Sequence, residues 1–292
     1  MSQSSKITLQ QAVDAPPGFQ TSTKLTVAST WASASTDYFT YIQYIEAANT
    51  TDLQFGLATA QTVALSFWVK SSVAGTYTCS IRNPVNNRAY LFTYSVTTGW
   101  TKVTASVPGD ITGTWPTGGA GKGMQVEFDL GSGSLYSTTT NSWVNGNMFK
   151  ATGSTSLVAQ AVNSTMNITG VQLELGTVAT PFEQRSIGAE MMLCQRYYQS
   201  VLYGFSGINN GNTSGFMCGR IYPMRSAPTV TAPGGLTFYT NGANVAGLMA
   251  VNSVTANGDI FINIGGYSGA IAGSPVILAG GATSPLVFNA EL

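Results

Sequence analysis

Short runs that alternate apolar and polar residues constrain the fold of this chain more than any other feature. In residues 124–130 (MQVEFDL), every second side chain is apolar and those between are polar. The apolar set is Met124, Val126, Phe128 and Leu130, and the polar set is Gln125, Glu127 and Asp129. Because successive side chains of a β-strand point to opposite faces of a sheet, this run predicts a strand with one buried and one solvated face.

Similar strand-like runs, separated by Gly, Pro, Asn and Ser, precede this one along the chain. They cover residues 37–46, 62–71, 75–83, 88–96 and 100–108. Many short strands at such spacing are typical of a β-sandwich or jelly roll. The segment that follows, 131–166, is polar, and its composition predicts a loop.

Residues 171–186 (VQLELGTVATPFEQRS) predict the end of this sandwich. The alternating residues of the last strand are Val171, Gln172, Leu173, Glu174 and Leu175. Pro181 cannot donate a hydrogen bond to a neighbouring strand, so the strand must end before it. We expect Phe182 to pin the exit to the core, and Glu174 to have a structural or surface role.

Residues 186–200 (SIGAEMMLCQRYYQS) depart from the β pattern and predict a helix of about four turns. Ser186 is expected to cap it, with Ile187 as its first residue. One apolar stripe at helical spacing consists of Ile187, Met191, Cys194 and Tyr198. Because Met192, Leu193 and Tyr197 widen this stripe, the helix must be covered on more than one side, by a domain or by copies of itself.

Strand-like runs return at 214–224, 236–241, 258–266 and 275–281. The charged residues after position 200 are few, namely Arg220, Arg225, Asp259 and Glu291. So few charges predict that much of this region lies in a subunit interface. The sequence therefore predicts an all-β chain: an N-terminal jelly-roll β-sandwich over 1–185, one linking helix over 186–200, and a smaller β-sandwich-like domain over 201–292.

The charge balance of the chain excludes several classes of partner. Only 8% of the residues are charged, and 12 Lys and Arg balance 12 Asp and Glu. Such a chain has no basic surface for nucleic acid. The start, MSQSSKITLQQ, shows no signal peptide, and no run of about 18 apolar residues predicts a membrane span. Three cysteines, Cys79, Cys194 and Cys218, cannot form a disulfide framework.

The residues usually needed for catalysis are scarce. The chain has no His, which is the commonest general base and metal ligand at neutral pH. Its cysteines lack metal-ligand spacing, and no phosphate-binding or dinucleotide motif occurs. We therefore expect no catalytic residues, no metal site and no cofactor. Glu127 and Asp129 are expected on a solvated face, with a glycosidase pair or a calcium site as alternatives.

Aromatic residues in polar segments suggest a ligand site. Sugar rings bury an apolar face on Trp or Tyr, while amides and carboxylates take their hydroxyl groups. Trp115, Tyr136 and Trp143 lie in loop-like sequence and are the candidate glycan-binding residues. The alternative is that these three pack against a neighbouring chain.

Six segments carry a resemblance to a known family. In order along the chain they are GFQTSTKLTV (18–27), LSFWVKSSVAGTYTCSIRN (65–83), GWTKVTASVPGDITGTW (99–115), ITGVQLELGTVATPFEQRS (168–186), EMMLCQRYYQS (190–200) and YPMRSAPTV (222–230). Together they resemble bacteriophage tail-fibre and virion structural proteins, in which a carbohydrate-binding-module-like jelly roll precedes a short helix and a C-terminal β-domain. The resemblance extends from about residue 7 to the terminal FNAEL.

This resemblance implies a non-enzymatic fibre or spike on the virion exterior, tail or capsid, made in the host cytoplasm. It implies a homotrimer whose partners are itself, other virion proteins and host surface glycans, without nucleic acid or membrane insertion. Met191, Arg196, Tyr197 and Tyr198 are the expected interface residues, with Arg196 paired to Glu190 or Glu183 of another subunit. A capsid-decorating or head-fibre protein without a receptor role is one alternative, which the missing N-terminal attachment segment favours. A glycan depolymerase is the other.

Overall fold

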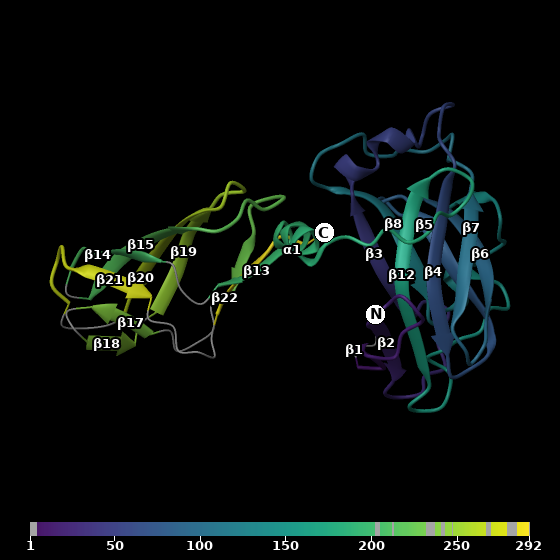
Figure 1. Ribbon diagram of the computed structural model, residues 1–292, viewed down its shortest axis with the longest axis horizontal. Helices are drawn as coiled ribbons and strands as arrows, with labels where there is room; N and C mark the ends of the chain where they lie inside the picture. The colour runs from purple at the N-terminus through teal and green to yellow at the C-terminus, as the bar shows by residue number, and fades with distance from the viewer. Residues whose placement is uncertain are drawn as a thin grey trace. The chain divides into compact units, whose positions relative to one another are not determined.

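A computed structural model of the chain contains two compact units, residues up to Glu183 and residues Gln184–Glu291 (Figure 1). The division falls two residues before the predicted boundary at 185/186. The structure describes residues 5–201, 205–211, 213–231, 237–240, 243–246, 248–266, 270–278 and 285–291. Nearly all of the predicted runs form strands, so the chain is all-β with one α-helix in the described part.

The first unit is a jelly-roll sandwich of two antiparallel sheets. Sheet A has the order β1 (Ile7–Ala12), β2 (Ser22–Val27), β12 (Thr165–Leu175), β4 (Val63–Ser71) and β7 (Thr101–Val107). Sheet B has the order β10 (Trp143–Asn145), β6 (Arg88–Val96), β5 (Gly75–Arg82), β8 (Lys122–Asp129) and β3 (Thr40–Glu46). The short elements are η1 (Ala47–Asn49), η2 (Thr51–Leu53), η3 (Ser134–Tyr136), and the parallel pair β9 (Ser137–Thr138) and β11 (Lys150–Ala151).

One apolar core lies between sheets A and B. Sheet A contributes Leu65, Phe67 and Val69 from β4, and sheet B contributes Tyr77, Cys79 and Ile81 from β5. The predicted apolar face of β8 is confirmed, because Met124, Val126 and Phe128 are buried in the same core. Aromatic rings pack edge-to-face across it, as Phe67 does with Phe128 at 4.9 Å.

The other face of β8 is not solvated, which corrects the sequence prediction. Glu127 and Asp129 are each 1% exposed, and Gln125 is also buried. The cause is the segment 131–160, part of the 131–166 stretch predicted as a loop: apart from β10, which joins the edge of sheet B, it folds over this face. Hydrogen bonds hold it there, including Ala151 N to Thr78 Oγ1 at 3.0 Å. We call this segment the covering loop.

Strand β12 ends the sandwich as predicted, although it lies in the middle of sheet A between β2 and β4. Glu174 fastens the exit turn, since its carboxylate accepts hydrogen bonds from the Thr180 amide at 2.8 Å and hydroxyl at 2.7 Å. Phe182 packs edge-to-face on Phe19, with ring centres 5.0 Å apart. The expected structural role of Glu174 is confirmed.

In the second unit, the described residues form α1 (Ile187–Gln195) and, after it, two sheets. The smaller sheet has the order β13 (Tyr198–Val201), β22 (Leu286–Asn289) and β16 (Thr229–Thr231). The larger has the order β18 (Ala243–Ala246), β17 (Thr237–Thr240), β21 (Pro275–Leu278), β14 (Ser206–Asn209), β15 (Ser214–Arg220), β20 (Asp259–Gly265) and β19 (Leu248–Val254). Their common core includes Met217, Phe238, Ile262 and Phe288.

The helix is shorter than predicted. Ser186 caps it as expected, accepting a hydrogen bond from the Ala189 amide at 3.3 Å. Tyr198, however, belongs to β13 and pairs with Asn289 of β22, so strand pairing ends the helix before the predicted stripe is complete. The large apolar side chains of α1 are all exposed. Among the described residues, no helix has the length and apolarity needed to cross a membrane.

Gly123 allows β8 to pass close to η1. A Cβ atom there would lie 2.5 Å from Ala47 Cα, whereas a Cβ at Gly121, two residues earlier, meets nothing within 4 Å. We expect Gly123→Ala to lower the free energy of unfolding by about 3 kcal/mol, because backbone atoms must move. The matched variant Gly121→Ala should change it by less than about 0.5 kcal/mol. Urea denaturation measures both, and equal effects would contradict the close approach.

Candidate functional site

The hollow beside the covering loop is the candidate site, and a buried ion pair forms part of its wall. Arg82 ends β5 and Glu127 lies on the adjacent β8, with Arg82 Nε 2.7 Å from Glu127 Oε2. Their side chains are 5% and 2% exposed. Two charges taken out of water must be paired, and this contact pairs them across the two adjacent strands.

The polar contacts of Arg82 extend to both sides of the pair. Its guanidinium donates to Gln125 Oε1 at 3.1 Å and to Asn147 Oδ1 in the covering loop. Gln125 in turn donates to Asn86 Oδ1 at 2.9 Å and to the Asn83 carbonyl at 3.1 Å. The network therefore fixes the covering loop against β5 and β8.

Burial raises the pKa of both acidic residues of β8, Glu127 and Asp129. It raises the pKa of the Glu127 carboxyl, an effect that the nearby Arg82 charge opposes. It also raises the pKa of Asp129, which accepts a hydrogen bond from the Ser132 amide at 2.9 Å. Asp129 lies beside Thr40 of β3 and does not line the hollow.

Aromatic rings form the remaining wall of the hollow. The Tyr136 ring stacks on Phe149 with ring centres 4.6 Å apart, and Phe149 lies 4.8 Å from the Arg82 guanidinium. On the other side, the Lys122 ammonium lies 3.6 Å from the centre of the Tyr44 ring. The hollow has a volume of about 260 Å³. We call it the Arg82 pocket, and it is lined by Tyr38, Thr40, Ile42, Tyr44, Arg82, Pro84, Asn86, Lys122, Gln125, Glu127, Tyr136, Asn147 and Phe149.

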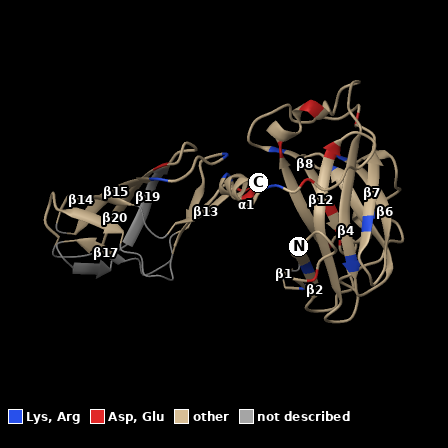
Figure 2. Ribbon diagram, viewed as in Figure 1, with Lys and Arg blue, Asp and Glu red and all other residues tan. Residues whose placement is uncertain are grey.

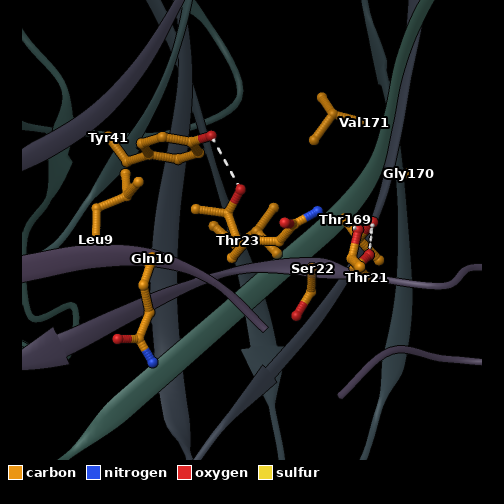
Figure 3. Close-up of a pocket in the computed structure, with 11 residues that line it drawn as sticks. Leu9, Gln10, Thr21, Ser22, Thr23, Tyr41, Thr169, Gly170 and Val171 are labelled. Atoms are coloured by element: carbon orange, nitrogen blue, oxygen red, sulfur yellow. Dashed lines mark hydrogen bonds between the residues drawn. The ribbon is translucent and has the colours of Figure 1, made fainter. Parts of the chain in front are cut away.

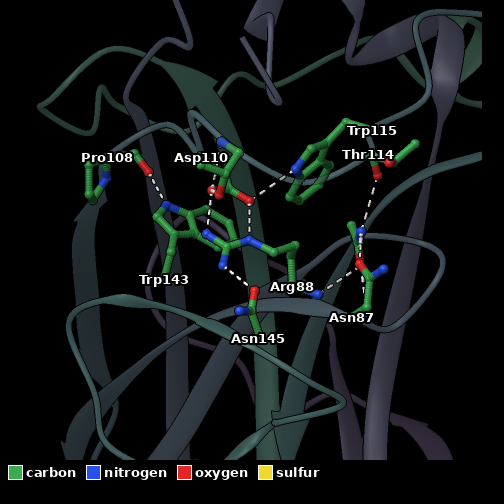
Figure 4. Close-up of polar contacts among 10 residues, drawn as sticks. Asn87, Arg88, Pro108, Asp110, Thr114, Trp115, Trp143 and Asn145 are labelled. Carbon is green, nitrogen blue, oxygen red and sulfur yellow. Dashed lines mark hydrogen bonds and ion pairs between the residues drawn. The ribbon is translucent and has the colours of Figure 1, made fainter. Parts of the chain in front are cut away.

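The three predicted glycan-binding residues are not brought together. Tyr136 lines the Arg82 pocket, but Trp115 and Trp143 lie in a separate cluster (Figure 4). Trp115 is 7% exposed because it packs edge-to-face on Phe55 and Trp143, at 4.9 and 5.7 Å. Its loop-like sequence gave no sign of this burial, since the packing partners are distant along the chain.

An ion pair organises the tryptophan cluster. Arg88 donates from Nε and Nη2 to the two carboxylate oxygens of Asp110, at 2.7 and 2.6 Å (Figure 4). Trp115 donates its indole N–H to Asp110 at 3.1 Å, and Trp143 donates its own to the Pro108 carbonyl at 2.7 Å. Both indole N–H groups are therefore already bound within the protein.

A second hollow, of about 450 Å³, lies beside β1, β2 and β12 (Figure 3). Its residues include Leu9, Val171 and Tyr41, whose hydroxyl lies 3.4 Å from Thr23 Oγ1. Although this hollow is larger, the described residues around it offer one aromatic ring and no charged group. The Arg82 pocket therefore has the richer chemistry.

Sequence reasoning missed most of the Arg82 pocket. The available signal was a pair of opposite charges, Arg82 and Glu127, each at a polar position of a predicted strand. It could have indicated that the two strands lie side by side. The calcium site given as an alternative for Glu127 and Asp129 would need several oxygen ligands close together. The described residues contain no group of three or more Cys, Asp or Glu placed to hold a metal ion. Within the chain, Arg185 Nη1 lies 3.3 Å from Glu190 Oε1, and the contact of Arg196 with another subunit stays a prediction.

Comparison with known proteins gives little further guidance. No protein-family model and no curated protein matches the sequence. Solved structures similar to this chain include one described as CBM4, with a TM-score of 0.32, 12% identity, and coverage of 57% of this chain and 78% of that one. Another is the CBM22-1 xylan-binding domain of Paenibacillus barcinonensis Xyn10C, with a TM-score of 0.30, 9% identity, and coverage of 59% and 83%. With TM-scores this low, the similarities carry no conclusion about ligands.

The Arg82–Glu127 pair generates a stability prediction. Arg82→Met leaves a buried carboxylate without its partner, and Glu127→Gln leaves a buried guanidinium, so each should cost about 3–5 kcal/mol of unfolding free energy. The double variant leaves neither charge and should lose less than the sum of the two single losses. Urea denaturation of all four proteins measures the coupling, and strictly additive losses would contradict the pairing.

Asp110 generates a pH-dependent prediction. Burial alone would raise its pKa, but hydrogen bonds from Arg88, Trp115 and Thr112 lower it below the usual value. The stability from this depressed pKa is therefore present above the usual Asp pKa of about 3.9 and is lost as the pH falls through the folded-state value. Asp110→Asn should cost about 3 kcal/mol at pH 7. Thermal unfolding at several pH values measures the stability of both proteins. The difference in unfolding free energy between wild type and Asp110→Asn should shrink below about pH 4.

Proposed function

We propose that the chain is a carbohydrate-binding protein and that its glycan occupies the Arg82 pocket. The observation that carries the proposal is the meeting, in one hollow, of aromatic rings with amide, ammonium and hydroxyl groups. Sugars present apolar ring faces and many hydroxyl groups, so they are recognised by this combination. The volume of about 260 Å³ suits a single sugar unit of a longer chain.

The polar wall of the pocket is preorganised. Arg82, Gln125 and Asn147 already hold one another by hydrogen bonds, so a ligand need not order them. Tyr136 is likewise held by stacking on Phe149. Thr40, Asn86 and Lys122 supply further polar atoms along the same wall.

We propose that binding occurs without catalysis. Glycoside hydrolysis uses two carboxyl groups that flank the bond to be cleaved. Of the described residues around the pocket, only Glu127 carries a carboxylate, and Arg82 is bound to it. This favours a binding module over the depolymerase. Release of reducing ends from a bound polysaccharide would contradict it.

We also propose that the chain is a structural protein on the exterior of a bacteriophage virion, assembled as a homotrimer and contacting host surface glycans. The ordered sequence segments and the few charges after residue 200 support this proposal. A capsid-decorating protein without a receptor role is the second candidate. Immunogold labelling of particles distinguishes tail from capsid, and the mass in solution tests the trimer.

Substituting the rings of the pocket tests carbohydrate binding. A glycan array identifies a ligand, and titration calorimetry then compares wild type with Tyr44→Ala and Tyr136→Ala. Each ring contributes about 0.5–1.5 kcal/mol, so the dissociation constant should rise about 2- to 12-fold. Tyr222→Ala, which removes an exposed ring in the other unit, is the matched control and should bind as wild type does. Equal affinities for all four proteins would overturn the assignment of the pocket.

A further inference from the structure

The larger sheet of the second unit is apolar on both faces. One face contributes Met217, Ile262, Val276 and Phe238 to the core. On the opposite face, five large apolar side chains are each between 42% and 53% exposed. They are Ile208, Phe216, Tyr239, Phe261 and Ile277, and we call the surface they form the outer face. A sheet with one solvated face normally alternates apolar and polar residues, so this pattern indicates a second covered layer.

Strand register makes the outer face continuous across β17, β21, β14, β15 and β20. One row of directly opposed residues is Tyr239, Ile277, Ser206, Cys218 and Phe261. The adjoining row is Pro275, Ile208, Phe216 and Asn263. Directly opposed side chains lie about 5 Å apart on the same face of a sheet. The exposed apolar groups therefore form one patch.

The patch is electrically neutral. Arg220 and Asp259 are the charged residues among the described positions on this side, and they lie opposite one another in β15 and β20. Arg220 Nε is 3.3 Å from Asp259 Oδ1, so each neutralises the other within one chain. Figure 2 shows β14, β15 and β20 without charge over most of their length.

The outer face is large enough to form the centre of a contact between copies. An aromatic side chain of this kind buries about 150–250 Å² when fully covered, so half-exposed rings and aliphatic groups leave about 80–100 Å² each. The five side chains together expose about 400–500 Å², which is as large as the largest apolar patch of a typical monomeric protein, and patches of that size are often functional. Covering this patch on two copies would remove about 800–1,000 Å² from water, somewhat less than the about 1,200 Å² of the smallest stable interfaces, so residues around the patch must also take part in the contact.

We propose that the outer face is where copies of this chain bind one another, sheet against sheet. The inference builds on the self-association proposed above and adds the surface that carries it. A neutral face whose charges are paired internally can meet its own copy without repulsion. An anionic membrane would instead require unpaired Lys or Arg, which the described part of this face lacks. A partner with charged side chains would have to bury those charges against Phe261 and Ile277 without a pairing group, which is costly.

Paired isoleucine substitutions test the proposal. Ile277→Ser lies on the outer face, and Ile271→Ser removes an equally large, more exposed side chain that lies outside the strands of the same unit. Sedimentation equilibrium should show wild type and Ile271→Ser as the same oligomer. Ile277→Ser should weaken association by about 10- to 100-fold, as expected from the loss of one buried aliphatic side chain. Phe261→Ser is a second, independent variant with the same expected effect.

Cys218 provides a readout that needs no change on the outer face. It is exposed on β15, an interior strand of the sheet, whereas Cys79 is buried and Cys194 can be replaced by Ser. In Cys194→Ser protein, a soluble maleimide should modify Cys218 slowly in the oligomer and quickly after dilution to monomer.

The outcomes separate this inference from the broader proposal. A wild-type monomer at high concentration would overturn both self-association and the role of the outer face. An oligomer that Ile277→Ser and Phe261→Ser leave intact, with Cys218 fully reactive, would overturn the outer face alone. Dissociation by Met191→Ser instead would assign the contact to α1. Glycan binding in the first unit is measured independently and has no bearing on these results.

Discussion

The buried ion pair of Arg82 and Glu127 is the contact on which the wall of the candidate site depends. Neither charge could leave water alone, because the cost of an unpaired buried ion is several kcal/mol. Their pairing at 2.7 Å allows the covering loop to close over sheet B. That closure brings Phe149 and Tyr136 against the strands and so creates the Arg82 pocket. The site and the stability of its wall therefore depend on the same contact.

The two units differ in how the sheet face that points away from the core is covered. In the first unit, segment 131–160 of the same chain covers a polar face that includes Glu127 and Gln125. In the second unit, the outer face is apolar and the described residues leave it exposed. A polar face can be covered by a loop that satisfies its hydrogen bonds one by one. An apolar face requires only a flat apolar surface, which another copy of the same sheet can provide.

Most of the strands of the first unit could be predicted because their signals are local, although β1, β2 and the short β9, β10 and β11 were not among the predicted runs. Alternation in 124–130 located β8 correctly, and Gly, Pro and Asn marked the strand ends with errors of a few residues. Ser186 identified the start of α1 for the same reason, since a cap acts on amides three residues away. The end of α1 could not be predicted, because Tyr198 pairs with Asn289, 91 positions later in the sequence.

The sequence by itself determined the strand pattern, the sandwich class, the scarcity of catalytic groups and the neutral surface, all of which follow from local spacing and composition. It also placed Tyr136 among the candidate binding residues. Only the tertiary structure decided that Glu127 is buried rather than solvated, that Trp115 packs into the core, and that Arg82 and Tyr44 share a hollow with Tyr136. These facts depend on which segment covers which face, and burial of that kind arises from contacts between residues far apart in the chain.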